Sequence, residues 1–322
     1  RNIRYHVEQL VGEQTGLQLD IGRLELELLP PAVVLHDVHL RHPKTPTPRL
    51  RVHESRVRVR PWPSSAGAIV VDLLAFEGLS GQLHEDDLAR LQQLSGGGGA
   101  GARLQLRHVV ARETTLALRS DKGTLRIEDA QLEVSPKSEA GQRISMAVER
   151  GSVRTPTDRW SFATTLRGQL KGGLTAPQHV QLDALRVAVN TLELHASGGL
   201  SLQGRPQIAL ELRAQTELAR LHKWFPQTPA MQGQASFEGR ISGALAAPRV
   251  RVDARVAELQ LAQRLIGTVA LSAVHRPGTL HRANRLHIES FRVEHPRAGT
   301  LTGSGGLHLR RPYRFDVPST LH

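Results

Sequence analysis

Apolar and polar residues alternate along most of the chain. In segment 250–256 (VRVDARV) every second residue is Val or Ala, and the residues between them are charged. Because successive side chains of a strand point to opposite faces, this alternation predicts a strand with one apolar and one polar face. About twenty such runs, spaced by Gly, Pro or a turn such as residues 121–123 (DKG), indicate antiparallel hairpins. We therefore predict a mainly β chain.

Three short segments have helical rather than strand periodicity. They are residues 2–14, 85–94 and 216–225. In the first, Ile3, Val7, Leu10 and Val11 form one apolar stripe, which we expect to close one end of the sheet. Each segment is too short to be stable alone, so we predict three short helices, near the N-terminus and mid-chain, that cap or plug the sheet.

A glycine-rich segment, residues 95–101 (SGGGGAG), has the composition of a flexible linker. It separates a mixed α+β region, residues 1–95, from a region that is nearly all strand, residues 96–322, which we expect to continue beyond this fragment. A repeated order of strand, glycine turn, proline and strand occurs at 166–185 and again at 233–256. Such repetition is typical of an elongated array.

The apolar faces of about twenty strands need a cover, and three short helices are too small to provide it. One solution is a sandwich or barrel, but only eleven aromatic residues are available to fill a closed interior. The other is a long antiparallel sheet curled into an elongated open β-groove, like a folded taco. We predict this groove and assign sixteen residues to its wall: Leu104, Leu106, Leu125, Ile127, Leu192, Leu194, Ile208, Leu210, Leu212, Val250, Val252, Val256, Leu259, Leu261, Leu307 and Leu309.

Composition narrows the class of protein. The chain has no run of about 18 apolar residues, so we expect no membrane span within it. It has no cysteine, which excludes disulfides and thiolate chemistry and is compatible with an oxidising compartment such as the periplasm. The net charge is +12, and arginine far outnumbers lysine. A solvated polar face is the first interpretation, attraction to anionic headgroups the second. Nucleic acid is third, because no aromatic stacking platform accompanies the arginines.

No catalytic or metal motif is present. His36 and His39 point to opposite faces of one strand, so they do not chelate a metal together. The glycine runs lack the Lys-Ser/Thr of a phosphate loop, and no Gly-x-Ser-x-Gly elbow occurs. Asp86 and Asp87 are explained by the start of a helix. We predict a protein that is not an enzyme, without cofactor or metal.

The first forty residues resemble the N-terminal region of the AsmA-like family, which includes TamB relatives. The resemblance rests on a helix followed by Thr15-Gly16, the Ile-Gly-x-Leu strand at 21–24, and the Leu-x-Asp-Val-x-Leu motif at 35–40. Segment 239–261 (GRISGALAAPRVRVDARVAELQL) is similar to the repeats of these proteins. The specific motifs of the resemblance lie at the start of the chain. The remainder resembles the family only in its repeated order of strands and turns.

The resemblance implies a periplasmic β-groove tied to the bacterial inner membrane by an anchor helix upstream of Arg1. It implies phospholipids or other acyl lipids as ligands, moved towards the outer membrane, and outer-membrane assembly proteins as partners. The leading hypothesis is therefore a lipid-transfer conduit. The alternative is an assembly factor for outer-membrane proteins that pairs its edge strand with client strands. A closed β domain without ligand is third.

Overall fold

The computed structural model describes residues 5, 8–9, 18–41, 49–60, 69–84, 104–121, 123–138, 141–156, 159–173, 176–190, 192–221, 230–275, 285–308, 314–316 and 319–321. The chain divides into two compact units, residues 1–178 and 179–322. We describe each unit by itself.

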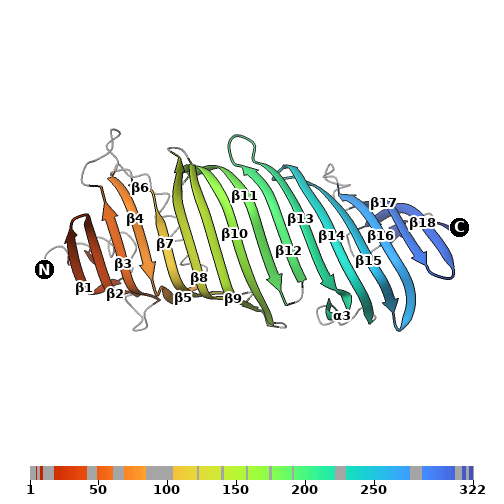
Figure 1. Ribbon diagram of the computed structural model, residues 1–322, viewed down its shortest axis with the longest axis horizontal. Coiled ribbons are helices and arrows are strands. Elements are labelled where there is room, and N and C mark those ends of the chain that lie inside the picture. The colour runs from red at the N-terminus through yellow and green to blue at the C-terminus, as the bar shows by residue number, and fades with distance from the viewer. Residues whose placement is uncertain are drawn as a thin grey trace. The chain divides into compact units, whose positions relative to one another are not determined.

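The chain is mainly β, as predicted, and its strands follow the alternating runs (Figure 1). The first unit contains β1 (Gln18–Leu28), β2 (Pro31–Arg41), β3 (Leu50–Val59), β4 (Ile69–Glu77), β5 (Ser80–His84), β6 (Leu104–Leu106), β7 (Val109–Ser120), β8 (Gly123–Ser138), β9 (Gly141–Arg154) and β10 (Arg159–Gly173).

The second unit is built from β11 (Ala176–Val189), β12 (Leu192–Ser201), β13 (Gln207–Glu217), β14 (Met231–Ala244), β15 (Arg249–Leu261), β16 (Arg264–His275), β17 (Arg285–His295), β18 (Gly299–His308), β19 (Arg314–Asp316) and β20 (Ser319–Leu321). From β11 to β18 each strand pairs antiparallel with the next one along the chain. This is the meander that short turns between alternating runs predict.

The first unit departs from a simple meander at one place. β4 and β5 follow one another along the same side of β3, with Gly78 at the break between them. On their other side both pair in parallel with β7, and β4 also pairs in parallel with β6. A parallel pair needs a crossover connection rather than a tight turn. The predicted hairpin at residues 121–123 is confirmed, because β7 pairs antiparallel with β8 from Ser120↔Gly123 onwards.

The prediction of three short helices is not confirmed. Within the described residues the only helical segment longer than two residues is the single turn α3 (Leu218–Leu221). Thr216 and Glu217, predicted to begin the third helix, belong to β13, because the alternation that starts at Ile208 continues through them and pairs with β14. Segment 85–94 and the stripe at Ile3, Val7, Leu10 and Val11 lie outside the described residues. No helix in the described part of the chain is long and apolar enough to cross a membrane.

The strands of the first unit are kinked along one line. Asp37 on β2, Glu113 on β7 and Asp129 on β8 have positive φ, as does Gly78 between β4 and β5. These positions are neighbours across the sheet, because Asp37 lies opposite His53, Gly78 follows the pair Glu77↔Arg112, and Asp129 precedes Ala130, the partner of Thr114. Asp129 accepts a hydrogen bond from Arg150 on β9, and this bond raises the pKa of Arg150. Such kinks bend a sheet locally.

A second line of kinks crosses three strands of the second unit. Gly233 on β14, Glu258 on β15 and Gly267 on β16 have positive φ and lie next to one another. The extra residue at Glu258 changes the phase of the alternation in β15. Val256 pairs with Ala235 and Leu261 with Met231, and these two partners are four residues apart on β14. Leu259 and Leu261 therefore share a face with the valines before the bulge.

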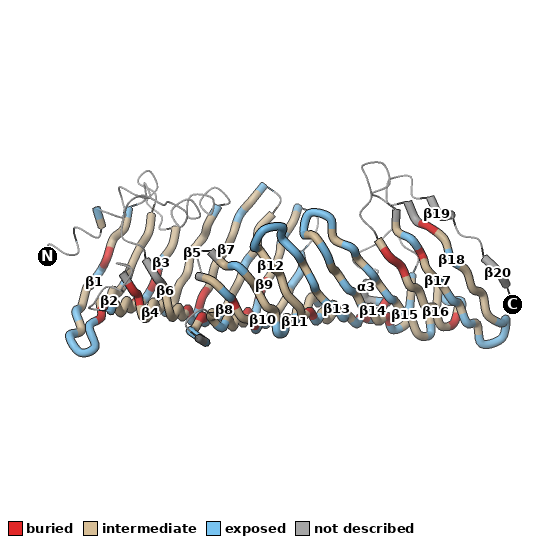
Figure 2. Tube along the Cα trace, turned by 90° about the horizontal axis from the view of Figure 1, so that it is seen from above, coloured by how far each residue is buried: buried red, intermediate tan, exposed pale blue. Residues whose placement is uncertain are grey.

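Few side chains are fully buried. Ile21 is the only large one below 2% exposure among the described residues, and most apolar side chains are half-buried (Figure 2). In β13 half-buried and exposed residues alternate strictly up to Thr216. Each strand has its close contacts with the strands that it pairs with, and no unpaired strands of the described part pack closely on one another.

The predicted boundary between residues 95 and 96 stays a prediction, since the glycine-rich linker lies outside the described residues. Strands on either side of it, β4 and β7, belong to the same unit and pair with each other.

The kink line of the second unit gives a test. A Cβ at Gly267 would clash with the carbonyl oxygen of Glu294, and its φ of 105° strains any other residue. We expect Gly267→Ala to lower the free energy of unfolding by about 2 kcal/mol or more, as measured by urea denaturation. The control is Gly239→Ala, whose new Cβ would lie 3.4 Å from Leu212 and should cost below about 0.5 kcal/mol. Equal stability of the two variants would contradict this account of the kink.

Candidate functional site

The strand registers of the second unit place apolar residues in continuous rows across one face of the sheet. The central row crosses eight strands and consists of Val187, Leu194, Ala214, Phe237, Ala254, Leu271, Phe291 and Gly303. A neighbouring row, two residues away on most strands, consists of Leu185, Ala196, Leu212, Gly239, Val252, Ala273, Ile288 and Gly305. Side chains two apart share a face, so these rows form one apolar surface.

A cavity of about 950 Å³ is centred on the central row. On each of the strands β13 to β18, the residue of this row and its two flanking residues line the cavity. Large and small side chains alternate along it, because Phe237 and Phe291 stand on either side of Ala254 and Leu271. Four strands at a spacing of about 4.8 Å separate the two rings by roughly 14 Å between strand axes. The volume lies at the upper end of the range of small-molecule pockets.

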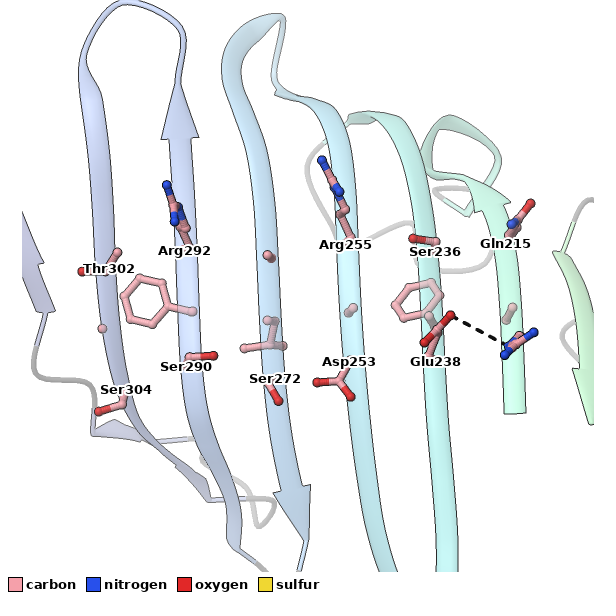
Figure 3. A pocket seen from close by; sticks show the side chains of 18 residues that line it. Gln215, Ser236, Glu238, Asp253, Arg255, Ser272, Ser290, Arg292, Thr302 and Ser304 are labelled. Carbon is pink, nitrogen blue, oxygen red and sulfur yellow. Dashed lines mark ion pairs between the residues drawn. The ribbon is translucent and has the colours of Figure 1, made fainter. Parts of the chain in front are cut away.

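The polar residues that flank this row define its borders. Figure 3 shows them in two lines across the strands, one with Gln215, Ser236, Arg255, Arg292 and Thr302, the other with Glu238, Asp253, Ser272, Ser290 and Ser304. They alternate with the central row along each strand, so the cavity is bordered by polar as well as apolar residues.

A second cavity, of about 450 Å³, is lined by residues of β11 to β14. It is centred on a further row that contains Leu182, Gly198, Leu210 and Ile241. Gly198, with φ 137°, leaves no space for a Cβ beside the carbonyl oxygen of Ala209. The hollows therefore form where Gly or Ala interrupts larger apolar side chains.

The first unit has an apolar face of the same kind. One row crosses eight of its strands and consists of Leu26, Val33, Val57, Leu74, Val109, Val134, Ile144 and Gly168. Beyond the kink line, Ile127 pairs with Gly151, and the ring of Phe162 occupies the space that a Cβ at Gly151 would take.

The structure brings most of the predicted wall residues onto these faces. Leu192, Leu194, Ile208, Leu210, Leu212, Val250, Val252, Val256, Leu259 and Leu261 lie on the apolar face of the second unit, all half-buried. Leu125 and Ile127 lie on that of the first, Leu104 and Leu106 pair with Ile69 and Val71, and Leu307 pairs with Leu286. Leu309 lies outside the described residues. That these residues bind lipid stays a prediction.

The sequence analysis placed Ala254 on the apolar face of its strand but did not assign Phe237, Leu271 and Phe291, the other central residues of the larger cavity, to the groove wall. The signal was present as an alternation of large and small residues, but it runs across strands rather than along the chain. Only the register shows it.

The opposite face carries charged residues that pair across neighbouring strands or along one strand. Arg240 contacts Glu211 at 2.6 Å, Arg292 contacts Glu294 at 2.6 Å, and Arg213 lies 3.8 Å from Glu238 (Figure 3). All of these groups are exposed, so each pair contributes little stability. Their arrangement corresponds to a solvated face.

The histidines that suggested a metal contact other groups. The ring of His36 lies 3.7 Å from Glu25 and 3.9 Å from Glu54, and His39 accepts a hydrogen bond of 3.4 Å from Arg51. In the described part of the chain no three His, Asp or Glu side chains gather as a metal site would require. His42 lies outside that part.

No family model, curated protein or solved structure matches the chain. The family suggested by residues 15–40 stays a prediction from the sequence.

Filling the larger cavity should abolish binding there. We expect Ala254→Trp to weaken the binding of an apolar fluorescent probe by at least about tenfold, because the indole occupies the space between the two phenyl rings. The melting temperature should stay within a few degrees, since the new ring extends into an open hollow.

The matched control is Arg249→Trp, an exposed residue of β15 that does not line the cavity. Probe binding that falls equally in both variants would show that the cavity is not where the probe binds.

Proposed function

We propose that this chain is a non-enzymatic lipid-binding module that holds the acyl chains of phospholipids on its apolar faces and forms part of a lipid-transfer conduit. The observation that carries the proposal is the set of continuous apolar rows that no second layer of described strands covers. Burying a Val, Leu or Phe side chain stabilises by about 1.5–3 kcal/mol, so these half-buried rows favour an apolar ligand.

The finer architecture belongs to this proposal. We infer that the two kink lines curl the sheet of each unit into an open groove with the apolar rows inside. The burial pattern supports this, because apolar residues of β13 and β15 are half-buried while their charged neighbours are exposed. A closed sandwich would instead bury its inner rows almost completely.

The ligand class follows from the chemistry of the wall. The rows contain aliphatic and phenyl side chains, and buried polar groups on them are few, such as Thr114 and Thr216. A wall of this kind offers no set of directional hydrogen bonds, which suits hydrocarbon chains of varied length.

Location and partners rest on the resemblance of residues 15–40 to the AsmA-like family. On that basis we place the protein in the bacterial periplasm, anchored to the inner membrane, with transport directed towards the outer membrane and its assembly proteins as partners. The charge of +12 is compatible with anionic phospholipid headgroups, and no aromatic stacking platform for nucleic acid accompanies the arginines.

One observation favours the assembly-factor alternative. β1 pairs with β2 alone among the described strands, and the backbone N–H of Ile21 donates to the carboxylate of Glu8 at 3.1 Å. An unpaired strand edge is a template for a further strand. If client strands occupy this edge, Arg23→Pro, at an exposed position of β1, should abolish client crosslinking and leave bound lipid unchanged.

Copurification tests the lipid proposal directly. Mass spectrometry of solvent extracts from gently purified protein should detect phospholipid near stoichiometric amounts. Repeated absence of lipid from such material would overturn the proposal.

A charge on the apolar face should expel that lipid. We expect Val252→Asp to lower bound phospholipid by at least about tenfold, because an acyl chain cannot solvate a carboxylate. In an open groove the carboxylate reaches water when the lipid leaves, so the free energy of unfolding should fall by no more than about 1 kcal/mol. In a closed core the loss would be about 4 kcal/mol.

The control is Arg249→Asp, an exposed residue on the same strand but the opposite face, outside the larger cavity. Arg251 is less suitable, because it contacts Glu289 at 3.3 Å and its replacement would leave two acids together. Unchanged lipid content in folded Val252→Asp protein would show that this face does not hold lipid.

A further inference from the structure

The turn between β1 and β2 exposes leucine side chains to an unusual degree. Leu28 is 83% and Leu29 94% exposed, while Leu26 on the same hairpin is 55% exposed. Pro30 and Pro31 follow directly, are exposed themselves and restrict the backbone of the turn. Single exposed leucines are ordinary, but three on one hairpin tip mark a surface that meets an apolar partner.

This tip is continuous with the apolar face of the first unit. Leu26 is the first residue of the row that runs through Val33 and Val57 to β10. Because β1 pairs with β2 alone among the described strands, Leu26 stands at the edge of that face. An object that touches the tip therefore also touches the end of the apolar rows.

The acidic residues near the tip of the hairpin, Glu25 and Glu27, are paired with basic side chains. Glu25 contacts Arg23 at 2.6 Å and lies 3.7 Å from His36, and Glu27 lies 3.4 Å from Arg56. The next strand carries Arg58 opposite Ala32, near the turn. The exposed leucines of the tip therefore have no unpaired carboxylate beside them. A negatively charged surface would not repel the tip.

We propose that the β1–β2 tip is a membrane-contact element that inserts Leu28 and Leu29 into the interfacial layer of a phospholipid bilayer. A protein partner is less suited, since a stable protein interface needs about 800 Å² from each side and the tip is a narrow projection. A bilayer has no such requirement, because two or three inserted apolar side chains with nearby arginines already give reversible binding.

The membrane contact of the tip affects how lipid is loaded onto the apolar face. The inserted tip holds the edge of the apolar face against the acyl chains of the bilayer, so a lipid passes from one to the other without crossing water. This consequence rests on the proposed function, whereas the membrane contact itself does not.

Vesicle flotation tests the contact. The full chain is mixed with vesicles of phosphatidylethanolamine and phosphatidylglycerol and centrifuged through a density gradient. We expect the protein to float, and the double variant Leu28→Asp, Leu29→Asp to lose at least about tenfold in the vesicle-bound fraction. Both side chains are exposed, so the variant should fold normally.

The matched control is Leu245→Asp, a 44% exposed leucine in the turn after β14, which should change flotation by less than about twofold. The proposal is wrong if the wild-type chain does not float, or if the tip variant floats as well as wild type. It is also wrong if the tip variant changes the oligomeric state on gel filtration, since the tip would then join copies of this chain.

Copurified phospholipid is measured in the same preparations and separates the two proposals. If the protein floats but carries no copurified lipid, the proposed membrane contact is supported and the proposed lipid conduit is wrong. Ala254→Trp should float like wild type, because the larger cavity is not part of the tip.

Discussion

The backbone ladder between neighbouring strands is the interaction on which the rest of this structure depends. Few side chains are fully buried, and Ile21 is the only large one among the described residues. No second layer of described strands packs on the sheets. Stability must then come from paired strands of ten to sixteen residues and from contacts between side chains along each row. That constraint also leaves an apolar face available, since nothing in the ladder requires that it be covered.

A ladder of this kind is free to bend only where its hydrogen bonds are interrupted. The structure places such interruptions side by side, at Gly78 and Glu113 in the first unit and at Gly233 and Glu258 in the second. A single bulge would twist one strand against its neighbours, whereas aligned bulges let several strands turn together. Residues beside these lines, among them Ala130, Val148 and Ala235, are buried.

The sequence predicted the strands well because alternation is a local property that each segment carries by itself. The hairpin at residues 121–123 was equally readable from its turn residues. The parallel pairing of β4 with β7 was not, since it depends on a crossover whose partner strand no local pattern specifies. The helix predicted at Thr216 failed for a related reason: Leu218 and Leu221 have helical spacing, but the alternation of β13 extends to Glu217 and is fixed by β14.

The sequence was enough to predict which residues form the apolar wall, but not how those residues are placed relative to one another. Alternation identified Val250, Val252 and Val256, and the later Leu259 is out of phase with them by one residue. On an uninterrupted strand Leu259 would point away from the valines, so including it required a bulge that the sequence marks only with Glu258, a residue that seldom adopts positive φ. Predicting the cavity between Phe237 and Phe291 also requires the register of four strands, because its lining residues come together only across those strands. Local periodicity thus determines which faces are apolar, while the register between strands determines which residues of different strands meet around a cavity.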